Sequence, residues 1–249
     1  MTNRRYPLAL IPTLAFALTG CQAMWYTTPA GPANMPALTE SDIAHEMTRS
    51  PAAQFPARMA MVRVQAPGYR SYNCESYGSG KYSVVTARDA EKDADVQRIE
   101  KLPQVAALAP LNRMVIPYDL QTAKELRLAA ASLKTDLLLV YTIDTSFRIE
   151  HHEIGPLQAI GLGFLPNKEA VVTATASAAL FDVRTGYIYG LAESTAKETQ
   201  IASYWTSQQA VDSSRGKAES AAFTGLVTEF EKTWKGVVDQ YATKTAMAP

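Results

Sequence analysis

Two cysteines, Cys21 and Cys74, are the side chains of this sequence with the widest range of covalent chemistry. Cys74 lies in the stretch Tyr72-Asn73-Cys74-Glu75, which supplies no base that would convert the thiol into a nucleophilic thiolate. If Cys21 is consumed by modification, Cys74 has no partner within the chain, and a disulfide framework is excluded. We expect Cys74 to form an intermolecular disulfide if it is exposed, or to be inert if it is buried.

The first 21 residues have the layout of an export signal. Arg4 and Arg5 form a positive region, and an apolar stretch from Tyr6 to Leu18 follows, too short for a membrane span of about 20 residues. The sequence Leu18-Thr19-Gly20-Cys21 resembles the lipobox of bacterial lipoproteins. The resemblance implies that residues 1–20 are removed and that Cys21 carries lipid. The alternative is an ordinary secretory signal in which the cysteine is incidental.

Other reactive side chains predict neither a metal site nor a catalytic site. His151 and His152 are neighbours on an expected strand, so their side chains point to opposite faces and do not share an ion. No G-x-S-x-G elbow is present. Gly161 and Gly163 form only a fragment of a dinucleotide-binding fingerprint, because Pro166 stands where the third glycine would be. We expect no metal and no cofactor.

Charge excludes one class of partner. Removal of residues 1–20 takes away two arginines and no acid, which leaves 22 basic and 24 acidic side chains. A near-neutral surface without a basic cluster does not gather nucleic acid, so we expect no nucleic-acid binding. A content of 47% hydrophobic residues in 249 suits one globular domain.

The first part of the mature chain predicts a linker followed by short elements. Residues 22–57 hold five prolines and little apolar periodicity, which is typical of a flexible tether, with a two-turn helix within Thr39 to Arg49. The apolar run Met59 to Val64 predicts a strand. A surface helix over Asp89 to Lys101 and a strand over Val105 to Leu111 follow.

The second part predicts a secure helix and a group of long strands. Thr122 and Glu125 have the spacing of a capping box, and apolar residues then recur at helical intervals to Lys134. Alternating or continuous apolar residues predict the later strands, and a single apolar stripe predicts a long terminal helix. These elements are strands over Leu137 to Glu150 and Val171 to Val183, a turn over Asp182 to Gly186, a strand at Tyr187 to Tyr189, and a helix over Ser214 to Tyr241.

Two segments carry a resemblance to a known superfamily. Ala129 to Val140 is similar to the helix-to-strand junction of the CsgG curli-channel and TolB amino-terminal-domain superfamily. Ala179 to Gly190 resembles its strand, D-x-x-T-G turn and strand. The resemblance implies envelope lipoproteins or periplasmic modules that bind other proteins or assemble into rings, and not enzymes. The connection from Glu150 to Glu169 departs from that pattern, as does the absence of an obvious second pore-forming hairpin.

That connection is our first candidate for a partner contact. Ile154 to Pro166 is apolar, rich in glycine and uncharged, whereas connecting loops normally run on the surface and are polar. The alternative is that it folds back over the sheet. A loop rich in tyrosine and glycine around Tyr72 and Tyr77 is the second candidate. The expected contact residues are Tyr72, Tyr77, Ile154, Leu157, Ile160, Leu162, Phe164 and Leu165.

Taken together, the sequence predicts an α/β (α+β) domain with a mixed, mostly antiparallel sheet and a long carboxyl-terminal helix. We expect a signal peptide at 1–20, a lipid-anchored linker at 21–57, the domain at 58–241 and a disordered tail at 242–249. The predicted function is that of a non-enzymatic protein-binding or assembly module, anchored through Cys21 on the periplasmic side of the outer membrane and bound to another envelope protein. The alternatives are an oligomeric secretion component of the curli-channel type, with a membrane hairpin over 141–150 and 171–180, and an enzyme with an unrecognised site.

Overall fold

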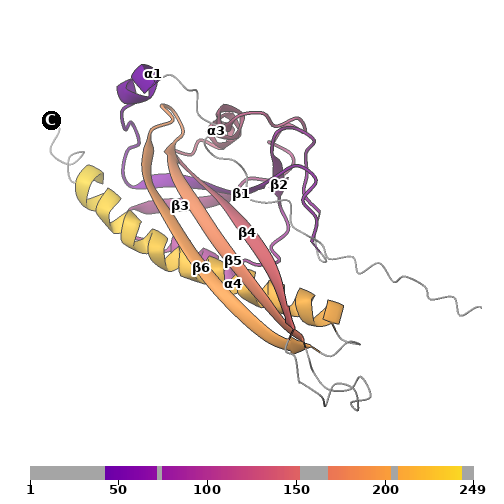
Figure 1. Ribbon diagram of the computed structural model, residues 1–249. Helices are drawn as coiled ribbons and strands as arrows, with labels where there is room; N and C mark the ends of the chain where they lie inside the picture. The colour runs from indigo at the N-terminus through magenta and orange to yellow at the C-terminus, as the bar shows by residue number, and fades with distance from the viewer. Residues whose placement is uncertain (1–42, 72–74, 152–167, 203–206, 243–249) are drawn as a thin grey trace, which may run out of the picture.

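The computed structural model describes residues 43–71, 75–151, 168–202 and 207–242. These residues form one mixed sheet of six strands with helices on both faces (Figure 1), which confirms the predicted fold class. The strand order is β2-β1-β4-β5-β6, and β3 also pairs with β1. The strands are β1 (Ala57–Gln65), β2 (Ser83–Val85), β3 (Val105–Pro110), β4 (Leu137–His151), β5 (Lys168–Asp182) and β6 (Ile188–Ala202).

Strand β1 joins the two kinds of pairing in the sheet. It pairs in parallel with β3 on one side and with β4 on the other, and antiparallel with β2. Parallel neighbours require a crossover connection. The helices α2 (Asp93–Glu100) and α3 (Ala123–Ser132) lie in the connections before β3 and before β4, respectively.

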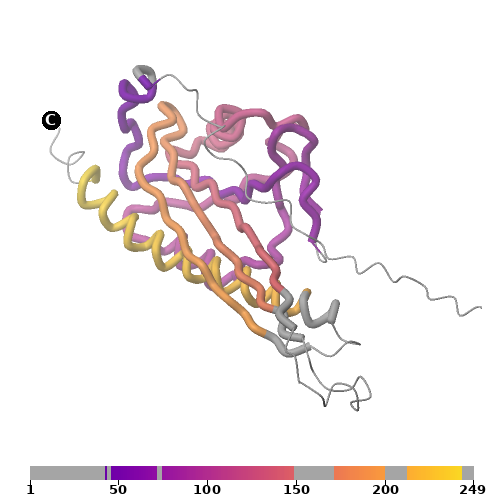
Figure 2. The backbone as a smooth tube through the Cα atoms, in the orientation of Figure 1, coloured from indigo at the N-terminus to yellow at the C-terminus, as the bar shows by residue number. Residues whose placement is uncertain are grey.

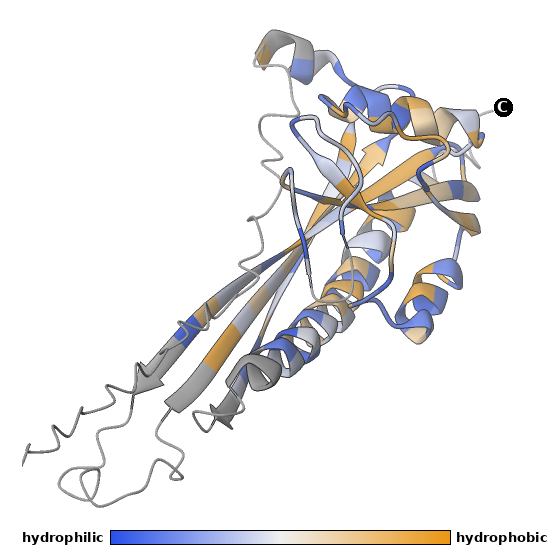
Figure 3. Cartoon of the chain, turned by 90° about the vertical axis from the view of Figure 1, so that its right-hand side faces the viewer, coloured by the Kyte–Doolittle hydropathy of each residue, from blue (hydrophilic) through white to orange (hydrophobic). Residues whose placement is uncertain are grey.

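The other half of the sheet is an antiparallel meander of three strands, each 15 residues long. At about 3.4 Å per residue, each spans about 50 Å. Figure 3 shows these strands extending from the rest of the domain together with the last helix. The third strand predicted at Tyr187 to Tyr189 is present, but it is longer than those residues: β6 begins at Ile188 and continues to Ala202. Apart from Leu191 and Ile201, its remaining residues are small or polar, so this part lacks the regular apolar alternation of a strand.

One face of the sheet packs against α2 and against α4 (Ser207–Val237). The apolar stripe of α4, which contains Phe223, Phe230 and Trp234, is buried there as predicted. Alternate residues of β4 and β5 meet it, and Ala174 and Ala176 are fully buried. In this fold the apolar face of the β4–β5 hairpin therefore packs on a helix. Within the described residues, no helix is long and apolar enough to cross a membrane.

The opposite face packs against α3 and the segment that precedes it. Leu126 and Ala130 of α3 cover Leu138 and Val140 of β4 and the end of β5. The predicted start of the helix is confirmed, because the carboxylate of Glu125 accepts a hydrogen bond from the backbone N–H of Thr122 (3.0 Å). This layer stops short of β6, which contributes no residue to the cluster beneath α3.

Asp182 organises the turn between β5 and β6. Its Oδ1 accepts hydrogen bonds from the backbone N–H groups of Arg184 (2.9 Å) and Thr185 (3.0 Å), which closes the D-x-x-T-G turn. Gly186 takes a positive φ of 74°, a conformation that favours glycine. The predicted turn role of Asp182 is thus explained by its own hydrogen bonds.

The same carboxylate also holds the segment that precedes the sheet. Its Oδ2 accepts the N–H groups of Ala52 (2.7 Å) and Ala53 (2.9 Å) and the hydroxyl of Tyr189 (3.0 Å). Phe55 packs on the ring of Trp234, with ring centroids 5.8 Å apart. The last residues of the predicted linker therefore contact the domain, following the short helix α1 (Ile43–Thr48). Figure 2 traces this path along the edge of the domain.

Candidate functional site: an apolar groove on the open face of the sheet

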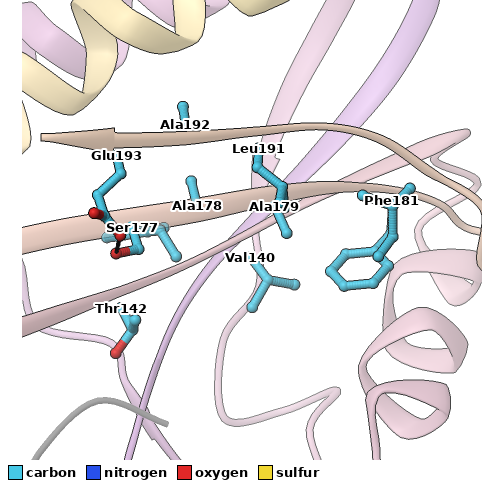
Figure 4. A pocket seen from close by; sticks show the side chains of 11 residues that line it. Val140, Thr142, Ser177, Ala178, Ala179, Phe181, Leu191, Ala192 and Glu193 are labelled. Atoms are coloured by element: carbon cyan, nitrogen blue, oxygen red, sulfur yellow. Dashed lines mark hydrogen bonds between the residues drawn. The ribbon is translucent and has the colours of Figure 1, made fainter. Parts of the chain in front are cut away.

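A groove of about 700 Å³ lies on the open face of β4, β5 and β6, where the layer formed by α3 ends. We call it the β-face groove. Figure 4 shows Val140, Ala179 and Leu191 pointing to the same side of the sheet, away from α4. The side chains that define it are Val140, Thr142, Ser177, Ala179, Phe181, Ile188, Leu191 and Glu193.

The floor and the outer wall of the groove differ in exposure. Val140 and Phe181 are buried beneath the surface, whereas Leu191 is 68% exposed and Ile188 is 39% exposed. A large apolar side chain on the surface is unremarkable alone. Here two of them border an apolar hollow whose size falls in the range of ligand and side-chain pockets.

The opposite end of the groove is polar. The hydroxyl of Ser177 donates to the carboxylate of Glu193 on the neighbouring strand (2.7 Å); Ser177 is half-buried and Glu193 is exposed. The hydroxyl of Thr142 donates a hydrogen bond to the side-chain oxygen of Gln65 (3.0 Å). The groove can thus hold an apolar group and place a donor or a positive charge beside Glu193.

Strand β6 forms one edge of the sheet and pairs, among the described residues, only with β5. Its side chains alternate, so that Leu191, Glu193, Thr195 and Lys197 are exposed on the open face. The facing helix partly covers this edge, because the hydroxyl of Thr233 donates to the carbonyl of Leu191 (3.2 Å). Charged residues and a covering helix both protect an edge strand from non-specific pairing.

Of the predicted contact residues, Tyr77 is described and lies apart from the groove lining. It pairs with Val84 in an isolated bridge, and its ring stacks edge-on against Tyr118 (centroids 5.3 Å apart). The guanidinium of Arg113 lies over the same ring, 5.4 Å from its centroid. The other predicted residues lie outside the described residues: Cys21, Tyr72, Cys74, Ile154, Leu157, Ile160, Leu162, Phe164 and Leu165.

A buried ionic cluster on the α4 side is the most polar part of the interior. Arg63 of β1, 1% exposed, contacts Asp89 (2.7 Å) and Glu91 (3.4 Å), and donates to the hydroxyl of Tyr69 (2.9 Å). The hydroxyl of Tyr141 donates to Glu91 (2.9 Å). Burial raises the pKa of Tyr69 to about 12 and that of Tyr141 well above its ordinary value.

Two residues of α4 complete this cluster. Arg215 donates to Glu219 through Nε (2.7 Å) and also to Tyr69, and Glu219 accepts the hydroxyl of Thr145 (2.7 Å). The charged members are paired within the interior. The cluster therefore fixes α4 to β1 and β4.

Two S-x-x-K sequences occur in the chain, but neither forms a serine–lysine pair. Ser194 and Lys197 are three apart on β6, so their side chains project from opposite faces. Ser214 of α4 is buried, whereas Lys217 is exposed. The described residues also contain no group of three or more histidine, cysteine or acidic side chains placed to hold a metal ion.

No protein-family model and no curated protein matches this sequence. Similar solved structures include a DUF330-family protein from Xanthomonas campestris, 13% identical, with a TM-score of 0.35 over 76% of this chain and 91% of that one. Lipoprotein GNA1162 from Neisseria meningitidis is 12% identical, with a TM-score of 0.30 over 64% and 94% of the two chains. A PelC dodecamer from Paraburkholderia phytofirmans is 14% identical, with a TM-score of 0.29 over 72% and 91%. At such scores the similarity assigns no function to this chain.

Proposed function

We propose that this chain is a lipid-anchored protein of the bacterial cell envelope that works as a protein-binding or assembly module through the β-face groove. The observation that carries the proposal is an open apolar groove, bordered by exposed Leu191 and Ile188, on an otherwise polar sheet face. The occupant we propose is an apolar segment of a protein. Its side chains would cover Leu191, and a basic or hydroxyl group would meet Glu193.

Burial of Leu191 supplies a definite part of the binding free energy. Complete burial of a leucine side chain is worth about 1.5–3 kcal/mol, so covering a residue that is 68% exposed contributes roughly 1–2 kcal/mol. Side chains that enter the groove beside Val140 and Phe181 add their own burial. A contact of this size suits a module that assembles reversibly with its partner.

The lipobox at Leu18 to Cys21 supports the anchoring part of the proposal. The hydrogen bonds of Ala52 and Ala53 to Asp182 set the point at which the chain leaves the domain. With α1 held nearby, 22 residues (21–42) would separate the lipid from the domain. A flexible chain of that length spans roughly 25 Å, which keeps the groove within reach of partners at the periplasmic side of the outer membrane.

Two substitutions in the full chain test the two parts separately. Cys21→Ala should abolish labelling by palmitate and release the protein from the membrane fraction. Leu191→Glu should leave the protein in the membrane but remove the species that co-purify with it after gentle detergent extraction.

The matched control is Met114→Glu, because Met114 is 90% exposed and lies outside the groove. It introduces the same charge in place of an apolar side chain. If Leu191→Glu and Met114→Glu retain the same co-purifying species, the groove is not the binding site. If Cys21→Ala stays in the membrane with its labelling unchanged, the proposed anchor is wrong.

A further inference from the structure

The short helix α1 carries a second exposed apolar surface. Ile43 is 79% exposed and Met47 is 81% exposed. Residues four apart lie on the same face of a helix, so these two side chains form one apolar knob. In Figure 1, α1 stands at one end of the domain.

The knob does not fill the groove of its own chain. Arg49 donates from Nη1 to the carbonyl of Gly186 (3.3 Å), which ties the end of α1 to the turn between β5 and β6. Arg49 also pairs with Glu46 (2.7 Å). With α1 held in this way, Met47 and Leu191 are both exposed, and neither Ile43 nor Met47 is among the residues that line the groove.

We propose that Ile43 and Met47 of one copy insert into the β-face groove of a second copy. This inference rests on the proposed function and names the partner at the same groove as another molecule of this chain. The knob and the groove are different surfaces, so the contact is head-to-tail. Repetition of such a contact gives a ring if the rotation closes and a filament if it does not.

Confinement by the lipid anchor is part of the proposed assembly. A six-residue helix with two apolar side chains buries less than the roughly 1,200 Å² of a standard stable interface. Anchored chains share one surface, and tethering raises the effective concentration of knob and groove without any new contact. We therefore expect assembly of the anchored chain and weak association of the free domain.

The experiment pairs cysteines between two differently tagged full-length copies expressed together in cells, with Cys74→Ser in both. One copy carries Met47→Cys and the other carries Leu191→Cys, and a non-reducing gel is probed for a band that contains both tags. The control pair combines Met47→Cys with Met114→Cys, which has the same number of cysteines. We expect the mixed-tag band to be at least tenfold stronger for the first pair.

A mixed-tag band that is absent, or equal in the two pairs, overturns the self-assembly proposal. If Leu191→Cys instead forms a disulfide with a different protein, the groove binds a partner as proposed, but the partner is not a second copy. The failure of this inference is thus distinguishable from the failure of the proposed function. All three positions are exposed, so the substitutions leave the fold in place.

Discussion

Substitution of Asp182 by asparagine should release the segment around Ala52 and Ala53 from the domain. The carboxylate is fully buried and accepts hydrogen bonds from four backbone N–H groups and one tyrosine hydroxyl. An asparagine side chain has one oxygen and one NH₂ group. In either orientation the NH₂ group faces two N–H donors, those of Ala52 and Ala53 or those of Arg184 and Thr185.

The expected loss follows from this count. Each hydrogen bond to a charged acceptor contributes about 1.5–3 kcal/mol, so the loss of two lowers the free energy of unfolding by about 3–6 kcal/mol. Domains of this kind have total stabilities of about 5–15 kcal/mol. The matched substitution Asp136→Asn affects a half-buried carboxylate that accepts the N–H of Arg58 at 3.1 Å, and asparagine keeps that acceptor. Its expected effect is below about 1 kcal/mol.

Urea unfolding of both variants measures the difference, and limited trypsin digestion reports on the segment itself. Arg49 is half-buried next to Gly186, and its release should speed cleavage after this residue in Asp182→Asn. Equal stability losses for Asp182→Asn and Asp136→Asn would show that the backbone hydrogen bonds to the Asp182 carboxylate do not stabilise the fold as calculated. A large loss of stability with unchanged cleavage at Arg49 would show that Asp182 supports the turn and not the preceding segment.

Two further predictions test the packing and the buried cluster. Gly80→Ala places a Cβ 2.1 Å from the carbonyl oxygen of Leu120 and should lower the free energy of unfolding in urea by about 1–3 kcal/mol or more. Gly216→Ala, with open space around its Cβ in α4, should raise the free energy of unfolding by up to about 1 kcal/mol. Equal effects of the two substitutions would contradict the close approach at Gly80. Because burial raises the pKa of Tyr69 from 10 to about 12, the unfolded chain loses this proton first as the pH rises, so the stabilising effect is complete below pH 10 and is lost between pH 10 and 12, by roughly 3 kcal/mol. Tyr69→Phe should flatten the fall in the free energy of unfolding over that range, and an unchanged slope would contradict the assignment.

Much of the fold follows from local patterns in the sequence. The alternation in β4 and β5, the stripe on α4 and the Thr122–Glu125 spacing each reflect forces that act within one element. Most of strand β6 could not be predicted from its local pattern, because Gly190, Ala192 and Ser194 are small residues that allow α4 to approach closely. Their role depends on the helix opposite them.

The β-face groove could not be predicted for a related reason. Its lining comes from β4, β5 and β6, and it exists because the layer formed by α3 ends before β6. The signal that was available is Leu191, a large apolar residue on a face of β6 that otherwise carries Glu193, Thr195 and Lys197. The predicted contact residues of the loop Ile154 to Pro166 stay a prediction, as do Cys74 as an intermolecular thiol and Cys21 as the lipid attachment site.

A photo-crosslinking amino acid at position 191 of the full chain, used in cells, shows whether the β-face groove binds a protein. A single incorporation at position 191 should give a discrete crosslinked species on irradiation, and incorporation at position 114, which is more exposed, should give none. If the crosslinked species contains two copies of this chain joined between position 191 of one and Met47 of the other, the occupant is a second copy. The absence of any crosslink at position 191, or the same crosslinks at 191 and 114, would show that the β-face groove is not a protein-binding site.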